Sequence, residues 1–144
     1  MKNLLINLFT VLITFYSPII GIMLSVGIVI GFDTIIGVYS AKRRRIKITS
    51  RKLRKGLIPK LLWYQLAILS LYPIDYFLLN DVVNEVFKFE FFFTRLLGLI
   101  LVYIEFKSID EHVVILTGKS IIFHLKELIN KTRNLKNDIN DIKQ

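Results

Sequence analysis

Residues 18–41, PIIGIMLSVGIVIGFDTIIGVYSA, decide the fold of this chain, because Asp33 is the only charged residue among them. An α-helix rises about 1.5 Å per residue, and the hydrocarbon core of a bilayer is about 30 Å thick. Roughly 20 consecutive apolar residues therefore predict a helix that crosses a membrane. The apolar composition continues toward the amino terminus, and residues 4–41 contain no other charged side chain.

This apolar region is too long for one crossing helix and predicts two, with a break at Ser17-Pro18. Proline is tolerated in the first turn of a helix and disrupts the interior. We therefore expect helices over residues 3–16 and 18–41. The second helix is long enough to cross a bilayer. The first is short, and it either crosses or lies in the membrane interface.

Two further apolar segments, residues 57–79 and 86–106, have short apolar centres that flanking aromatic and lysine side chains can extend. These segments predict an all-α, multi-span helical membrane protein with three or four hydrophobic helices and a cytoplasmic C-terminal helix. Residues 1–106 would form the membrane domain, and residues 107–144 a helical tail. The composition is 53% hydrophobic and lacks cysteine, which excludes disorder, disulfides and cysteine-based metal sites.

Positive charge is concentrated between residues 42 and 60, where ten basic and no acidic residues carry +10; the rest of the chain carries −1. Short loops rich in lysine and arginine stay on the cytoplasmic side of a membrane. We therefore predict a cytoplasmic basic loop at residues 42–56, an acidic outer turn and a cytoplasmic C-terminus. The loop is expected to bind anionic lipid head groups rather than nucleic acid. The residues concerned are Lys42, Arg43, Arg44, Arg45, Lys47, Arg51, Lys52, Arg54 and Lys55.

Ionisable residues inside a membrane are rare and usually paired. Depth counted from the cytoplasmic helix ends, at residues 41 and 106, places Asp33 about 12 Å and Arg95 about 16 Å inside the bilayer. The two depths match within the reach of a side chain, so we predict an Asp33–Arg95 pair.

Lys60 and Glu105 both lie near the inner face and form a second predicted pair. Asp75 lies toward the outer face and needs no buried partner. Either all five of these residues only fix helix packing, or Asp33 lines a polar interface or a pore.

Small residues in the 18–41 helix recur at four-residue spacing, which lets helix backbones approach closely in lipid. They predict a surface for self-association and hence a homo-oligomer. Its members are Gly21, Ser25, Gly27, Gly31, Gly37 and Ala41.

The tail combines a helix start with an apolar repeat. Ser108-x-x-Glu111 is typical of a capping box, and Gly118 is expected to break or bend the helix that follows. Apolar residues then alternate four and three apart, a heptad seam that predicts a coiled coil for self-assembly. An amphipathic helix on the membrane surface is the alternative. The seam contains Ile121, Leu125, Leu128, Thr132, Leu135, Ile139 and Ile142.

Catalysis has little support in the sequence. His112 and His124 lie 12 residues apart with no carboxylates at metal-ligand spacing, and they are expected to be ordinary helix residues. There is no glycine-rich phosphate loop, nucleophile elbow or HExxH motif. We expect neither enzyme activity nor a cofactor or metal.

Several positions occur in an order that resembles the toxin-secretion/phage-lysis holin family, over about residues 15–120. They are Asp33-Thr-Ile-Ile-Gly37-x-x-x-Ala41, the basic stretch, Ser50, Gly56-x-x-x-Lys60, Asp75, Lys107-Ser-Ile-Asp-Glu111 and Gly118. The resemblance implies a phage-encoded, multi-pass protein of the bacterial inner membrane. Such proteins accumulate there and assemble into lesions that release or activate a cell-wall hydrolase.

Two other functions fit the same residues. A non-lytic membrane anchor would recruit a cytoplasmic partner through its coiled tail. A small channel component would contact an ion through Asp33. The dense basic loop, Arg95 and the heptad-bearing tail are departures from the family pattern.

Overall fold

A computed structural model describes residues 2–142, without the side chains of residues 87 and 135–142. The elements in this part of the chain are helical, which confirms the predicted all-α fold class. In order they are α1 (Lys2–Tyr16), a 3-10 turn η1 (Ser17–Ile19), α2 (Ile20–Arg43), α3 (Ser50–Ile74), a π-helical turn η2 (Asp75–Leu79), α4 (Asn80–Phe87), α5 (Phe92–Thr117) and α6 (Ile121–Ile142).

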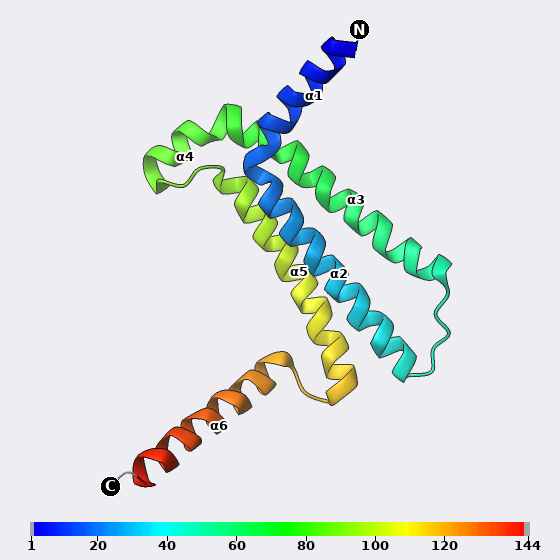
Figure 1. Cartoon of the computed structure of the whole chain (residues 1–144), viewed down its shortest axis with the longest axis vertical. Helices are drawn as coiled ribbons and strands as arrows, with labels where there is room; N and C mark the ends of the chain where they lie inside the picture. Colours follow the sequence, from blue (N-terminus) through cyan, green and yellow to red (C-terminus); the bar gives the residue numbers. More distant parts are fainter. Residues whose placement is uncertain (1, 143–144) are drawn as a thin grey trace.

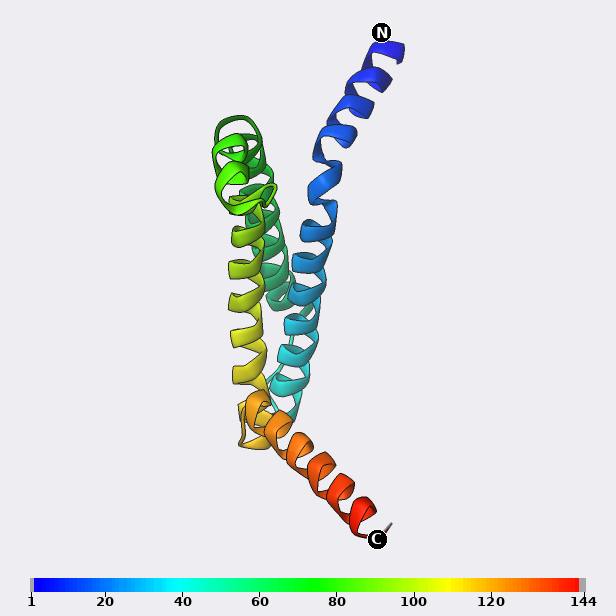
Figure 2. The same cartoon turned by 90° about the vertical axis from the view of Figure 1, so that its left-hand side faces the viewer.

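Three long helices, α2, α3 and α5, form a bundle (Figure 1). In it α2 and α5 run side by side in the same direction and α3 runs the opposite way, as Figure 2 also shows. α1 continues past one end of the bundle, and α6 leaves from the other. The core between the helices is small and consists of Ile19, Val26, Ile30, Ile68, Tyr72 and Leu101.

The predicted break near the amino terminus is confirmed. Pro18 lies in the first turn of η1, which separates α1 from α2. The lost backbone donor of proline is harmless there, because the first N–H groups of a helix have no intrahelical partner. α2 then continues to Arg43, where Lys42 and Arg43 lie in the last turn and oppose the negative end of the helix dipole.

The predicted basic loop at residues 42–56 is only partly a loop. α3 begins at Ser50, where the Thr49 hydroxyl accepts a hydrogen bond from the Lys52 N–H at 3.3 Å and caps the helix. The lysines and arginines that follow are good helix formers, so the helix starts seven residues before the apolar segment does. The connection between α2 and α3 is therefore limited to residues 44–49.

The structure also differs from the prediction at the apolar segment of residues 86–106, which is not one continuous helix. Residues 80–87 form the separate helix α4, and positive φ angles at Lys88 (55°) and Phe91 (52°) turn the chain before α5. α5 then runs without a break through Ser108, so the capping-box prediction of a helix start is wrong. The predicted break at Gly118 is confirmed, because this glycine has a φ of 75° and ends α5.

Large apolar side chains are exposed over most of the surface, including Leu4 (73%), Trp63 (70%) and Leu99 (67%). Two helical stretches, residues 2–43 and 50–86, are long and apolar enough to cross a bilayer. Core helices of soluble proteins and signal sequences meet the same criterion. A core helix, however, is mostly buried, whereas 22% of the most apolar part of each stretch is buried. α5 does not meet the criterion, since charged residues interrupt it.

The small residues of α2 point in several directions rather than along one face. Gly37 packs against the His112 ring, and Gly27 lies near the Gln65 side chain. Gly21 and Gly31 have no neighbouring atom within 4 Å of the position a Cβ would take. Self-association through these open positions stays a prediction.

α2 and α5 approach each other closely at Gly98, a residue that the sequence analysis did not select. A Cβ at Gly98 of α5 would lie 2.5 Å from Ile22 Cγ2 of α2. Such a distance requires one helix to move, because Cγ2 is attached directly to the Cβ of Ile22. Gly98 therefore allows α2 and α5 to pack closely.

Gly98→Ala is expected to destabilise the bundle by about 1–3 kcal/mol, the usual cost of overpacking. Thermal unfolding in detergent, followed by helical circular dichroism, measures the loss. Gly31→Ala is the matched control, since its Cβ meets open space, and it is expected to be neutral or slightly stabilising. Equal melting temperatures for the two variants would contradict the assigned packing.

Candidate functional site

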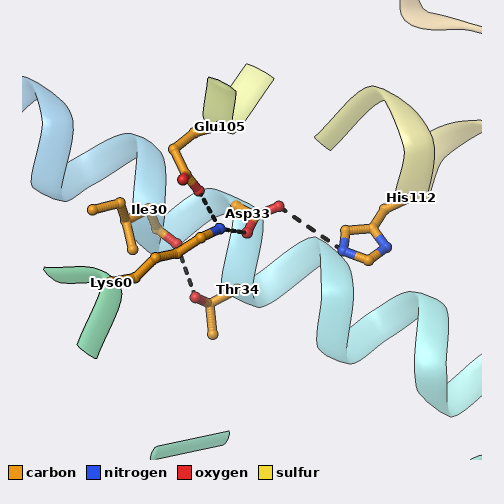
Figure 3. A network of polar contacts seen from close by, with 6 residues as sticks. All are labelled: Ile30, Asp33, Thr34, Lys60, Glu105 and His112. Atoms are coloured by element: carbon orange, nitrogen blue, oxygen red, sulfur yellow. Dashed lines mark hydrogen bonds and ion pairs between the residues drawn. The ribbon is translucent and has the colours of Figure 1, made fainter. Parts of the chain in front are cut away.

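One lysine links all three helices of the bundle. The Lys60 ammonium of α3 donates hydrogen bonds to Asp33 Oδ2 of α2 at 2.9 Å and to Glu105 Oε2 of α5 at 2.7 Å (Figure 3). Glu105 is fully buried, and Asp33 is 8% exposed. We call Asp33, Lys60 and Glu105 the charged clamp. The predicted contact between Lys60 and Glu105 is thus present, and Asp33 shares the same ammonium.

The register between α2 and α5 explains which residues meet. Gly98 is opposite Ile22 near one end of the pair, and His112 is opposite Gly37 near the other. The residue numbers differ by 76 and 75 at these two contacts, so the helices keep one register along their length. This constant offset is what two parallel helices of equal rise produce.

This register makes the predicted Asp33–Arg95 pair wrong. Asp33 lies beside Ser108, whereas Arg95 lies 13 residues earlier on α5, about 20 Å away along the helix axis. The prediction assumes a helix end at residue 106, but α5 continues to Thr117. Arg95 consequently lies near the start of α5, where it is exposed.

The charged clamp carries an uneven charge, because two carboxylates share one ammonium group. Asp33 Oδ1 and Glu105 Oε1 are buried and have no hydrogen-bond partner among the described residues. His112, to which the sequence analysis assigned no role, places its Nε2 atom 3.9 Å from Asp33 Oδ1 (Figure 3). A proton on this imidazole would balance the second negative charge.

A cavity of about 320 Å³ opens beside the clamp, between α2, α3 and their connection. Residues of two patterns described in the sequence analysis, the one that begins at Asp33 and the one that ends at Lys60, line this cavity together with residues of the basic stretch. The motif residues are Asp33, Gly37, Ala41, Gly56 and Lys60, and the basic residues are Lys47 and Lys52. Isoleucine, leucine and valine side chains form most of the remaining wall.

The nine predicted lipid-binding residues are all exposed. Lys42 and Arg43 end α2, Arg44, Arg45 and Lys47 lie in the connection, and the remaining four occupy the first turns of α3. They gather at the end of the bundle from which α6 also leaves (Figure 1). The cavity beside the clamp lies toward this same end, since residues of the connection line it.

A third buried carboxylate, separate from the charged clamp, caps α5. Asp75 is completely buried, and its Oδ2 accepts hydrogen bonds from the Thr94 N–H at 2.7 Å and the Thr94 hydroxyl at 2.8 Å. The expectation that Asp75 needs no buried partner is therefore wrong. A carboxylate at a helix amino terminus satisfies free N–H groups and opposes the helix dipole. The link joins η2 to α5 across 19 residues, which local sequence signals do not report.

Part of the predicted oligomer tail lies outside the described side chains, namely Leu135, Ile139 and Ile142. Leu125 and Leu128 are exposed, and Ile121 is half-buried. Within residues 2–142, as far as side chains are described, no three histidine, aspartate or glutamate residues are grouped so as to hold a metal. Comparison with protein-family models, curated proteins and solved structures finds no match to the chain.

Lys60→Met is expected to destabilise the bundle by on the order of 3 kcal/mol, because it leaves two buried carboxylates without their counter-ion. Denaturant unfolding in detergent micelles measures the loss. Lys55→Met is the control, because Lys55 lies exposed on the same helix. The triple variant Asp33→Asn/Lys60→Met/Glu105→Gln is expected to recover most of the stability. Equal stability of Lys60→Met and Lys55→Met would refute the clamp.

Asp75→Ala is expected to cost about 1–2 kcal/mol, as the loss of a helix cap does. Hydrogen exchange of the first amides of α5 provides the local measurement, and these amides should exchange faster in the variant. Asp81→Ala, at an exposed aspartate of α4, is the matched control. Unchanged exchange at Thr94 in Asp75→Ala would argue against the cap.

Proposed function

We propose that this chain is a holin-like protein of the bacterial cytoplasmic membrane. It oligomerises in the bilayer and permeabilises it, and a cell-wall hydrolase is thereby released or activated. The proposal combines the resemblance of the spaced motifs with the polarity and the geometry of the bundle.

The polarity of the molecule supports a lipid surrounding. The two carboxylates of the charged clamp are buried between the helices, whereas leucine, phenylalanine and isoleucine side chains cover the outside. Ionisable residues in membrane helices typically face the bundle interior and pair with one another. The same arrangement in water would leave a large apolar surface hydrated while burying charge, which is unfavourable on both counts.

The proposed orientation follows from the distribution of charge. The basic end of the bundle faces the cytoplasm, as lysine- and arginine-rich connections do. α2, α3 and α5 have 24, 25 and 26 residues, about 36–39 Å each, which exceeds the hydrocarbon thickness. We assign one crossing to each. α1 then lies at the outer end, with its apolar side chains in the interface.

One observation carries the proposal: the positions that resemble the holin family lie close together in space. Asp33-x-x-x-Gly37-x-x-x-Ala41 and Gly56-x-x-x-Lys60 lie on different helices, yet all five residues line one cavity. Matches produced by chance in apolar sequence have no reason to meet in space. The convergence supports a shared site of the kind that the family motif implies.

Assembly is proposed to use the outer half of the bundle. Gly21, Ser25 and Gly98 line an open groove of about 350 Å³ between α2 and α5. A helix from a second copy fits such a groove, because small residues permit close packing in lipid. Separation of the helices during assembly would expose the clamp carboxylates and Lys60 to the developing water path.

Induced expression in a bacterium, together with a cytoplasmic peptidoglycan hydrolase, tests the function. We expect an abrupt loss of membrane potential, reported by a voltage-sensitive dye, followed by lysis only when the hydrolase is present. Lys60→Met should delay or abolish the collapse at equal membrane abundance, and Lys55→Met should behave like the parent chain. Cells that keep their potential while the protein accumulates in the membrane fraction would disprove the proposal.

The exposed apolar residues of α6 favour a second candidate, the non-lytic anchor that recruits a cytoplasmic partner. The same expression experiment separates the two functions. An anchor accumulates without harm, and its captured partner is lost when residues 119–144 are deleted. A channel component would instead give an ion-selective conductance that Asp33→Asn abolishes.

A further inference from the structure

The described part of α6 carries an apolar face that is wider than a heptad seam. Ile121, Leu125 and Leu128 follow the seam, but Ile122 and Ile129 lie beside it and are 64% and 65% exposed. At 100° per residue these five side chains cover an arc of about 120°. A two-helix coiled coil buries a narrow stripe, whereas a helix that lies on a surface presents a broad one.

Basic residues border this face on both sides. Lys126 and Arg133 follow one edge, and Lys131 lies beyond the other, where it pairs with Glu127 at 3.4 Å. Residues 119–134 contain four basic residues and one acidic residue, a net charge of +3. Lysine and arginine flanking a broad apolar face are typical of helices that bind the interface of an anionic membrane.

The start of α6 is held at the basic end of the bundle. Gly118 ends α5, and the Asp110 carboxylate of α5 accepts a hydrogen bond from the Ile121 N–H at 2.7 Å. The His124 ring contacts the Thr117 hydroxyl at 3.0 Å and adds a second link. α6 therefore begins at the same end of the bundle as the basic connection of α2 and α3 (Figure 1), at the level proposed for the inner head groups.

We infer that α6 docks on the anionic inner leaflet as an amphipathic surface helix, with Ile122, Leu125 and Ile129 inserted at the boundary of head groups and acyl chains. A second copy of α6 paired through the seam would leave Ile122 and Ile129 in water. Lipid covers the whole arc and also neutralises Lys126 and Arg133. The inference rests on the membrane location in the proposed function and not on permeabilisation.

Spin-label accessibility on the full chain tests this docking, since the chain has no native cysteine. Single variants Ile129→Cys, on the apolar face, and Asn134→Cys, on the opposite face, are labelled and reconstituted in vesicles containing phosphatidylglycerol. The label at residue 129 should collide with oxygen in preference to a nickel chelate, and the label at residue 134 should show the reverse. This contrast should shrink in vesicles of phosphatidylcholine alone, because the basic residues lose their anionic partners.

A label at Ile35→Cys, an exposed position of α2, distinguishes a failure of α6 docking from a failure of the membrane location. If it is accessible to oxygen while the label at residue 129 reports water, only the docking of α6 is refuted. If the label at residue 35 itself reports water, the membrane location fails as well. Dipolar broadening between labels at residue 129 of different copies would show pairing of α6 helices and would overturn lipid docking.

Discussion

The structure depends on a single ammonium group shared by two carboxylates from different helices. Lys60 reaches Asp33 and Glu105 at hydrogen-bond distance, and His112 is the nearest further ionisable group to Asp33, at 3.9 Å. Removing charges from water is costly, so the two buried carboxylates depend on the ammonium group that they share. Any rotation or shift of one helix by a single residue would separate a partner. The charged clamp therefore restricts register and rotation in a way that the small apolar core does not.

Two sets of polar contacts hold the helices together, one toward each end of the bundle. The clamp lies toward the basic end, whereas Asp75 at the opposite end holds the start of α5 through Thr94. Three rings near this end, Tyr72, Tyr76 and Phe91, contact one another with ring centroids 5.2–6.0 Å apart. Because Tyr76 follows Asp75 in the chain and Phe91 immediately precedes α5, this aromatic packing joins the same two segments that the cap links. Between these points the Gln65 side chain of α3 donates a hydrogen bond to the Met23 carbonyl of α2 at 3.0 Å, and Gly98 allows α2 and α5 to approach closely.

The sequence predicted the helical class, the break at Pro18, the end of a helix at Gly118 and the contact between Lys60 and Glu105. Each of these follows from local composition or from residues near the ends of helices. It did not predict that Lys60 also binds Asp33, because Asp33 was assigned to Arg95 on the assumption of a helix end at residue 106, whereas α5 continues to Thr117. The capping-box pattern suggested an end before Ser108, but the N–H groups there are already bonded within α5. The buried partner of Asp75 and the packing role of Gly98 were missed for a related reason, since both residues act on partners distant in sequence and neither has a local signature.

The spacing of the motif residues has a physical explanation in the clamp. Gly37 and Ala41 follow Asp33 at intervals of four, so they lie on the same face of α2 in the next turns toward the basic end. Gly56 precedes Lys60 by four residues, and because α3 runs in the opposite direction it also lies toward that end. A charged residue on each helix draws the backbones together, and small residues on the adjoining turns leave space beside it. The His112 ring fills part of this space at Gly37, and the cavity occupies the remainder. Larger side chains at these three positions would fill the opening between the clamp and the basic end, so the pairing of charge with small residues keeps a buried polar group close to a cavity at the basic end.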